Sequence, residues 1–222
     1  MEKFSETLRR EADPIWSRIL VHPFIVEMAK GTLPLKKFQY YLKQDHAYLF
    51  DYIRFLGLAT SRCENMDQAS FFSEILSAEF HFEIEMQRTI AKRIGLSLEE
   101  LSNTRMAPTT RAYTSFLIKV AATEGIGEIV AAMAPCPLTY LEIGRKNVPE
   151  DPTRMPVYAD WLAAYRSKES VEVSMRIQKM LDDLGHASTD SQKKRMLHNF
   201  LDASRYEYFF WEMAYKMEEW PI

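Results

Sequence analysis

Helical periodicity runs through almost all of this 222-residue chain and constrains its fold more than any other feature. Apolar residues recur every three or four positions. No segment alternates β-branched and polar residues between turn signals, so the sequence predicts no sheet. The chain has only 7 glycines. Its helix stops and starts divide it into about seven or eight predicted helices. We therefore expect an all-α fold in which residues 1–222 form one domain, an irregular helical bundle.

Proline, glycine and capping residues bound the predicted helices. The first covers residues 3–19, with Pro14 able to bend or restart it. The VHPF segment at 21–24 and a GTLP turn at 31–34 lead to a long helix over 35–63. Ser97 and Glu100 have the spacing of a capping box for a short helix. The remaining predicted helices cover residues 67–94, 108–122, 126–147, 156–165, 168–184 and 189–217.

Composition excludes several classes of protein. The net charge of −3 provides no electrostatic footprint for nucleic acid. Two cysteines do not form a disulfide scaffold, so a reducing cytoplasm is the simpler context. The charged N-terminus lacks the apolar stretch of a signal peptide. No run of 18 apolar residues occurs, and we therefore expect no membrane span.

The helix over 35–63 places one carboxylate on an apolar stripe. The stripe has the i, i+3, i+4, i+7 spacing of a core-facing surface, and Asp45 interrupts it. A buried Asp is costly without partners, and burial raises its pKa. Two interpretations stay open: a functional carboxylate, or a structural one bonded to a tyrosine hydroxyl of another helix. The apolar members are Phe38, Tyr41, Leu42, Tyr48, Leu49, Tyr52, Phe55, Leu56 and Ala59.

The last predicted helix repeats this pattern with Glu207. Its predicted buried stripe also contains Phe200, Ala203, Phe210, Trp211 and Ala214. On the opposite, solvated face, Glu212 and Lys216 can pair at i, i+4. The alternative is that Glu207 is a partly exposed residue at a helix crossing.

Cys136 lies between two prolines in the run AAMAPCPLTYLEIG. Pro137 removes a backbone N–H and conflicts with the carbonyl four residues back, so we expect a kink there. Cys136 shares an inward stripe with Tyr140, and it matters chemically only where its surroundings favour the thiolate. A lone cysteine in an apolar stretch can also pack simply as a small hydrophobe.

Three predicted helices thus each bring one reactive group to an apolar face. Because a small bundle has one core, we expect Cys136, Asp45 and Glu207 to converge. A thiol can act as a nucleophile, and a carboxyl group can donate or accept a proton. None of the five histidines has an evident place in this pattern, and the paired Glu-x-x-His motifs of a di-iron bundle are missing. The two glycine-rich phosphate-binding motifs are also absent.

At these residues the sequence resembles the thiaminase II (TenA) family over nearly its whole length. The resemblance is carried by VHPFIVEMAKGTLPLKKFQYYLKQDHAYL, APTTRAYTSFLIKVA, AAMAPCPLTYLEIG, PVYADWLAAY and ASRYEYFFWEMAY, in matching order and spacing. It implies a heme-oxygenase-like all-α fold, usually a homotetramer. It also implies hydrolysis at the exocyclic methylene of a 4-amino-2-methylpyrimidine, in thiamin pyrimidine salvage, with no metal or organic cofactor. The family's substrates are 4-amino-5-aminomethyl-2-methylpyrimidine and thiamin.

The resemblance also implies roles for individual residues. Cys136 matches the family nucleophile, which places the chain in the Cys-containing branch. Glu207 matches the acid that protonates the leaving group or ring. Asp45 matches the carboxylate that binds the pyrimidine amino group and ring nitrogen. The matching pocket aromatics are Tyr48, Tyr113, Tyr140, Tyr165 and Phe210.

One departure from the family pattern is visible, because Pro137 stands where an aromatic residue often follows the cysteine. The change should alter the local backbone and bears on substrate preference between thiamin and the aminomethyl pyrimidine. Three alternatives stay open. One is a protein of the same fold that binds a pyrimidine or thiamin without turnover. Another is an enzyme of the pyrroloquinoline-quinone-synthesis type, which calls for a histidine-rich pocket. The last is a purely structural helical protein, which leaves Asp45 and Glu207 unexplained.

Overall fold

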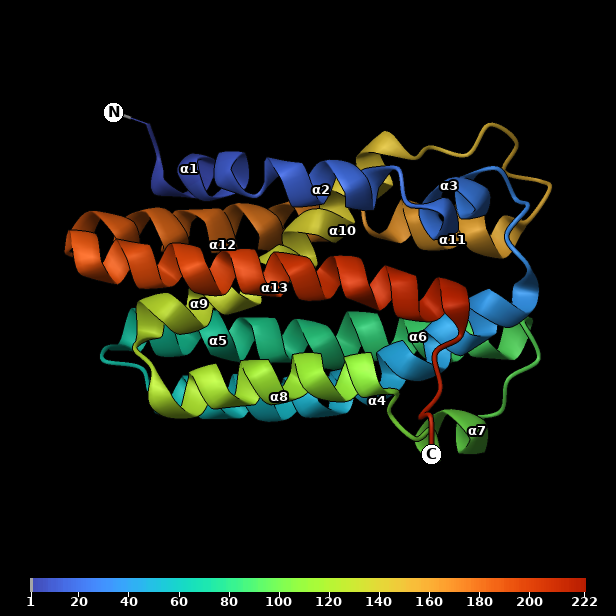
Figure 1. Cartoon of the computed structure of the whole chain (residues 1–222), viewed down its shortest axis with the longest axis horizontal. Helices are drawn as coiled ribbons and strands as arrows, with labels where there is room; N and C mark the ends of the chain where they lie inside the picture. The colour runs from blue at the N-terminus through green and yellow to red at the C-terminus, as the bar shows by residue number, and fades with distance from the viewer. Residues whose placement is uncertain (1) are drawn as a thin grey trace. The chain divides into compact units, whose positions relative to one another are not determined.

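The computed structural model describes residues 2–222, and within that range every regular element is a helix (Figure 1). The all-α prediction is confirmed. In chain order the elements are α1 Phe4–Glu11, α2 Asp13–Leu20, α3 Pro23–Ala29, α4 Leu35–Ser61, α5 Met66–Ala78, the π-helical η1 Glu79–Glu83, α6 Ile84–Arg93, α7 Leu98–Ser102, α8 Pro108–Thr123, α9 Ile126–Met133, α10 Pro135–Lys146, α11 Pro156–Ala164, α12 Lys168–Ala187 and α13 Asp190–Lys216.

Most predicted helix boundaries lie within a few residues of the observed ones. The capping box before α7 is present, since the Ser97 hydroxyl accepts from the Glu100 amide at 3.1 Å and the Ser97 amide donates to Glu100 Oε2 at 2.9 Å. Gly95, with φ +75°, follows the end of α6 as predicted. The predicted helix over 3–19 is two helices, α1 and α2, because Pro14 starts a new helix in its first turn.

The structure differs from the predicted helices in two further places. The short helix α3 was not among the predicted elements. It begins at Pro23, after His22 caps it by accepting from the Phe24 amide at 3.2 Å. The helix predicted over 67–94 is interrupted by η1, a π-helical segment in which the chain makes one wider turn.

The chain divides into two compact units. The first comprises Met1–Leu33 and Gly127–Trp211, and the second comprises Pro34–Ile126 and Glu212–Ile222. That residues 1–222 form one domain of this family's type stays a prediction.

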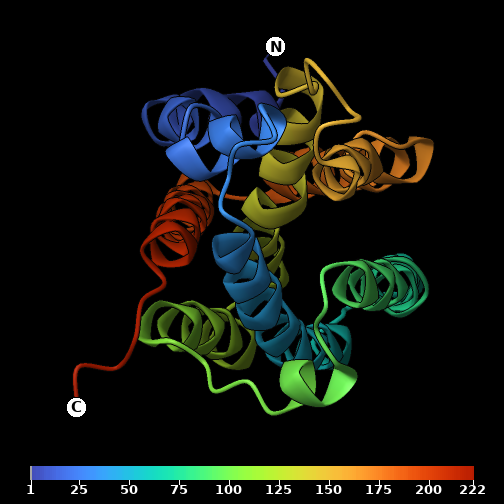
Figure 2. The ribbon, with the colours of Figure 1, turned by 90° about the vertical axis from the view of Figure 1, so that its right-hand side faces the viewer.

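In the second unit, α4 is the central helix. Figure 2 shows α8 on one side of α4 and the α5–α6 segment on another, and all three pack on it. The whole predicted stripe of α4 is buried, including Asp45. Asp51, which the pattern placed off the stripe, is buried as well, and it receives a hydrogen bond from Arg54 at 2.9 Å.

In the first unit, α1 packs on α12, α2 packs on α10, and α11 packs on α10 and α3. Gly144 of α10 allows the close approach to α11, because a Cβ there would lie 2.9 Å from the Leu162 carbonyl oxygen. Trp16 and Trp161 are each 1% exposed and fill this core. The indole N–H of Trp16 also donates a hydrogen bond to the Ser204 hydroxyl of α13, with 2.9 Å between nitrogen and oxygen.

One stretch within residues 2–222, Ile126–Lys146, is long and apolar enough to cross a membrane by length and composition alone. Of its 18-residue window, 78% is buried within the protein, as in the core helix of a globular domain. The stretch is also interrupted at Ala134, between α9 and α10.

Candidate active site

The chain breaks its helix beside Cys136, where the sequence predicted a kink. α9 ends at Met133 and α10 begins at Pro135, so both prolines occupy the first turn of the new helix. Ala134 links the two helices with helical dihedral angles, φ −61° and ψ −36°. Pro135 is buried, whereas Cys136 and Pro137 are half-buried. Cys136 is therefore partly accessible within a segment that is otherwise mostly buried.

Aromatic side chains gather one turn after Cys136. Tyr140 follows it by four residues on α10, on the same face of the helix. The Tyr140 ring lies 4.7 Å from the Tyr165 ring and 5.7 Å from the Trp161 ring, between centroids. Two of the predicted pocket aromatics, Tyr140 and Tyr165, are thus in contact with each other.

The carboxyl-terminal part of α13 faces this group. Glu207 is 2% exposed, and the whole predicted stripe around it is buried. Trp211, one turn after Glu207, lies 5.3 Å from the Tyr140 ring. The contact joins the α13 face that carries Glu207 and Phe210 to the α10 face that carries Cys136. We call Cys136, Tyr140, Tyr165, Glu207 and Phe210 the thiol cluster.

The predicted carboxylate of the second unit has polar partners. Asp45 is 7% exposed and accepts a hydrogen bond from Gln87 Nε2 of α6 at 2.6 Å. The Tyr41 hydroxyl also bonds its carboxyl group. The other polar atom of the Gln87 side chain, Oε1, lies 2.9 Å from Nδ1 of His46. The tyrosine that bonds Asp45 here, Tyr41, lies on α4 itself.

A second carboxyl group, Glu79 of η1, interacts electrostatically with Asp45. Burial raises the pKa of Asp45 to about 7, although the bonds from Gln87 and Tyr41 lower it. Burial, and then the negative charge of Asp45, raises the pKa of Glu79 to about 8. We call Asp45, Glu79, Gln87, Tyr41 and His46 the carboxyl cluster.

Two predicted aromatics adjoin Asp45 in the second unit. Tyr48 follows Asp45 by three residues on α4 and is 4% exposed. Its ring lies 5.3 Å from that of Tyr113 on α8 and 5.5 Å from that of Tyr52. Asp45, Tyr48 and Tyr113 therefore form a second group of predicted residues, next to the carboxyl cluster.

Glu79 and Gln87 were not predicted from the sequence. The signal was present in the four-residue spacing of Glu79, Glu83 and Gln87, which keeps the three residues within about 80° on one side of a helix. The residues between them include the apolar Phe80 and Phe82, which suggest a different buried face. The wide turn of η1 changes the helical period here.

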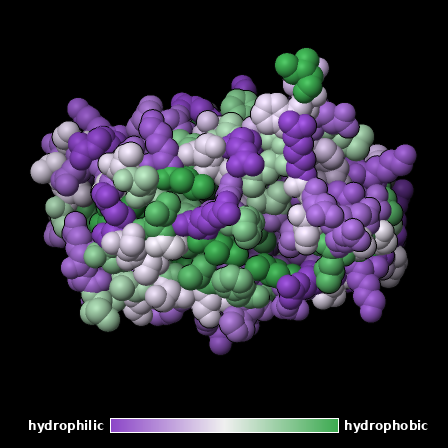
Figure 3. Space-filling view, turned by 90° about the horizontal axis from the view of Figure 1, so that it is seen from below, coloured by the Kyte–Doolittle hydropathy of each residue, from purple (hydrophilic) through white to green (hydrophobic). Residues whose placement is uncertain are grey.

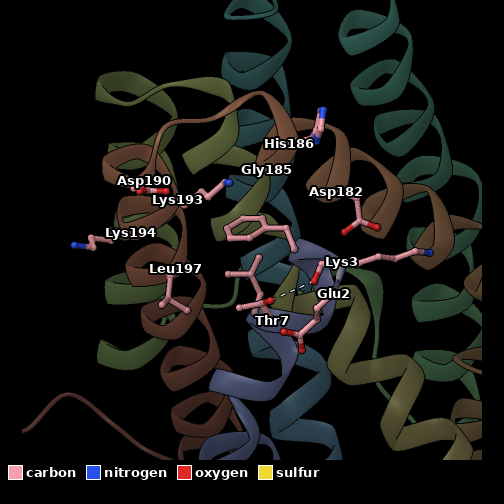
Figure 4. Close-up of a pocket in the computed structure, with 12 residues that line it drawn as sticks. Glu2, Lys3, Thr7, Asp182, Gly185, His186, Asp190, Lys193, Lys194 and Leu197 are labelled. Carbon is pink, nitrogen blue, oxygen red and sulfur yellow. Dashed lines mark hydrogen bonds between the residues drawn. The ribbon is translucent and has the colours of Figure 1, made fainter.

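A surface groove of about 650 Å³ lies elsewhere in the first unit, between the start of α1 and the neighbouring ends of α12 and α13 (Figure 4). Charges of both signs line it, among them Lys3, Asp182, Lys193 and Lys194. None of the eight predicted site residues borders this groove. It is therefore separate from both clusters.

Comparison with known proteins identifies the family. The model of the TENA/THI-4/PQQC family matches residues 9–217. An aminopyrimidine aminohydrolase of Halalkalibacterium halodurans is 36% identical over 219 residues, covering 98% of this chain and 97% of that protein. A solved TenA homologue from P. horikoshii OT3 has 31% identity and a TM-score of 0.89, over 97% of this chain and 99% of the other.

A more distant structure supports the fold alone. It is a domain of unknown function with a heme oxygenase-like fold from Shewanella denitrificans. Its identity is 15% and its TM-score 0.79, over 95% of this chain and 91% of that domain. The fold predicted from the sequence resemblance is confirmed. With a family match that spans nearly the whole chain, this protein belongs to the TENA/THI-4/PQQC family.

Proposed function

We propose that this protein is an aminopyrimidine aminohydrolase of the thiaminase II type, which releases 4-amino-5-hydroxymethyl-2-methylpyrimidine. The substrate is 4-amino-5-aminomethyl-2-methylpyrimidine, with thiamin as a second candidate. The observation that carries the proposal is the thiol cluster, in which an accessible thiol and a buried acid lie on two helix faces joined by aromatic rings. The relative from H. halodurans, which is named for this activity, supports it.

The family resemblance assigns the two groups of residues to different parts of the aminopyrimidine. A 4-aminopyrimidine offers a donor amino group next to an acceptor ring nitrogen. Asp45 would bind that edge, and Tyr48 and Tyr113 would border the ring. Cys136 and Glu207 would act at the reacting carbon atoms, with Tyr140, Tyr165 and Phe210 as aromatic walls.

The reaction follows from this assignment. The Cys136 sulfur adds to the ring carbon next to N1, and the proton of the thiol passes to that nitrogen. The electron-rich ring expels the amine from the methylene, and Glu207 gives it the proton it needs to leave as ammonia. Water then adds to the methylene and returns a proton to Glu207. The ring nitrogen returns its proton to the departing sulfur, so the Cys136 thiol is regenerated and the aromatic ring is restored. The net reaction converts the aminomethyl pyrimidine and water into the hydroxymethyl pyrimidine and ammonia.

Ammonia release from the aminomethyl pyrimidine tests this proposal. Cys136→Ala should lower the rate by a factor of about a thousand or more, because the covalent step is lost. Cys63→Ala is the matched control, since Cys63 is the other half-buried cysteine and its Sγ bonds the Ala59 carbonyl at 3.5 Å. Wild-type turnover by Cys136→Ala would refute the covalent mechanism. Tight binding of the pyrimidine without any turnover by the wild-type protein would instead indicate a binding protein.

We further propose a cytoplasmic homotetramer, as the family resemblance implies. Figure 3 shows hydrophobic side chains gathered near the middle of the face seen from below. In the second unit, large apolar side chains are exposed on α4 and η1, among them Phe50 at 59% and Phe80 at 49%. Such exposure is typical of interaction surfaces. Sedimentation equilibrium of the purified protein measures the assembly, and a monomer at micromolar concentration would refute it.

A further inference from the structure

Gln87 of α6 is a fully buried glutamine whose side-chain amide bridges two consecutive residues of α4. Its Nε2 donates a hydrogen bond to Asp45 Oδ2 at 2.6 Å, and its Oε1 lies 2.9 Å from Nδ1 of His46. Consecutive residues of a helix point about 100° apart and do not face each other. The amide of Gln87 therefore connects two side chains that could not pair directly.

Other buried glutamines of the same unit serve the backbone. Gln44 accepts from the Ala107 amide at 2.8 Å and donates to the Arg105 carbonyl at 3.0 Å. Gln68 accepts from the Glu64 amide at 2.8 Å. Backbone amides and carbonyls need such partners in any folded protein, so folding alone explains these two glutamines.

Folding does not explain Gln87 in this way, because its partners are side chains. Buried polar side chains that satisfy one another must first lose their bonds to water. Apolar residues of the same shape in their place can be nearly neutral for stability or even stabilising. The bridge of Asp45, Gln87 and His46 therefore indicates a role beyond stability.

The bridge has a direction that follows from what each group can donate. Oδ2 of Asp45 accepts from the amide nitrogen of Gln87, which leaves the amide oxygen toward His46. An amide oxygen can only accept, so Nδ1 of His46 must carry a proton and donate. His46 thus determines which end of the Gln87 amide faces Asp45.

We propose that Gln87 is a positioning residue for Asp45, and that His46 sets the direction of the Gln87 amide. This inference rests on the proposed function, because it assumes that Asp45 binds the aminopyrimidine edge. The last torsion of an aspartate side chain is broad, so an unbonded carboxyl group can rotate. With Gln87 on Oδ2 and the Tyr41 hydroxyl as a further partner, the plane of the Asp45 carboxyl group is fixed. A planar ring with a fixed donor group requires such an acceptor.

Two substitutions of His46 test the direction of the bridge. His46→Asn keeps a donor, because the asparagine amide nitrogen can take the place of Nδ1, whereas His46→Leu removes it. Helix propensity has the opposite order, since leucine suits a helix interior better than asparagine does. KM for the aminomethyl pyrimidine should stay within about threefold of wild type in His46→Asn and rise about tenfold in His46→Leu, with a smaller change in kcat. A merely structural His46 would tolerate leucine better.

Gln87→Leu tests the bridge at its centre. The substitution removes the donor to Asp45, so KM should rise about tenfold or more. Gln68→Leu is the matched control, because it removes another buried glutamine that bonds the backbone. The control should lower the Tm and leave KM unchanged. A wild-type KM in Gln87→Leu, or a lower KM in His46→Leu than in His46→Asn, would overturn the inference.

A wild-type protein that neither binds nor converts the aminomethyl pyrimidine would count against the proposed function instead. Nitrogen-15 NMR without ligand decides the direction of the bridge even then, or if Gln87→Leu does not fold. The ring signals of His46 are assigned by their loss in His46→Asn. A neutral His46 ring should carry its proton on Nδ1. A neutral ring with its proton on Nε2 would turn the Gln87 oxygen toward Asp45 and refute the inference.

Discussion

The thiol cluster and the carboxyl cluster both bury acidic groups on helix faces, but they surround them differently. Glu207 lies on a face of aromatic side chains, opposite a helix that carries Cys136, the cysteine of the first unit. Asp45 lies in a hydrogen-bonded network with Gln87 and Tyr41, beside a second carboxyl group. Aromatic walls around a nucleophile suit bond breaking, and a polar network suits recognition. The difference teaches that substitutions in the two clusters should separate kcat from KM.

The largest effect expected from this comparison is that of Glu207→Gln. The amide keeps the shape of the side chain but cannot donate the required proton, so kcat should fall about 100-fold or more with little change in KM. Steady-state ammonia release measures both constants. Glu212→Gln on the opposite face, where Lys216 pairs with it at 2.7 Å, is the control and should be near wild type. A rise in KM alone would assign Glu207 to substrate recognition. It would contradict the expected difference between the two clusters.

A smaller effect is expected from Asp45→Asn. The loss of a charge-assisted contact costs about 1.5–3 kcal/mol, so KM should rise roughly 10–100-fold and kcat should change less. The control is Asp51→Asn, which removes another buried carboxylate of α4 that bonds Arg54. Asp51→Asn should lower the Tm and leave KM unchanged. Equal effects of the two variants on KM would mean that burial alone, not recognition, explains Asp45.

Two glycine substitutions test the packing that supports the clusters. In Gly144→Ala the new Cβ would lie 2.9 Å from the Leu162 carbonyl oxygen and 3.1 Å from the Tyr165 carbonyl carbon. The backbone beside Tyr165 must shift, and we expect a loss of about 1–3 kcal/mol and a Tm lowered by several degrees. Gly57→Ala on the exposed side of α4 meets nothing within 4 Å and should stabilise by about 0.5–1 kcal/mol. Thermal unfolding followed by circular dichroism measures the Tm of both variants. A change of Tm in the same direction for both would contradict the packing argument.

The smallest effect is a pH dependence of stability confined to the carboxyl cluster. Asp45 and Glu79 have raised pKa values in the folded protein, about 7 and about 8, so they bind protons that the unfolded chain releases near pH 4. Their contribution is present at low pH and is lost as the pH rises through 7 and 8. Urea unfolding at pH 5.5 and pH 8 should show that the free energy of unfolding falls more in wild type than in Glu79→Gln. An identical loss in both proteins would show that Glu79 retains no proton.

Regular helices were the predictable part of this molecule. The stripes of α4 and α13 follow a 3.6-residue period for 27 residues each, so every buried position named from the pattern is buried, Asp45 and Glu207 included. The prolines around Cys136 also marked the break between α9 and α10. The Glu212–Lys216 ion pair is present as predicted.

The apolar periodicity could not predict the contacts around η1, because the helical period changes there. A π-helical turn has no distinct sequence signature in EFHFE, and the apolar phenylalanines there suggest the wrong buried face. Glu79 and Gln87 were therefore missed, although both interact with Asp45. The roles of Tyr48, Tyr113, Tyr140, Tyr165 and Phe210 in binding substrate stay predictions, because they came from the family resemblance.

The wide turn η1 also makes this part of the chain unusually tolerant of a change in its length. Removing one residue from η1 would let α5 and α6 continue as a single ordinary helix. Each residue of an α-helix accounts for about 100° of rotation, which is about what the wide turn absorbs, so the later side chains of α6 would keep nearly their present directions. Gln87 would stay near Asp45. The same deletion within the regular part of α4 or α6 would instead turn every later side chain away from its partners.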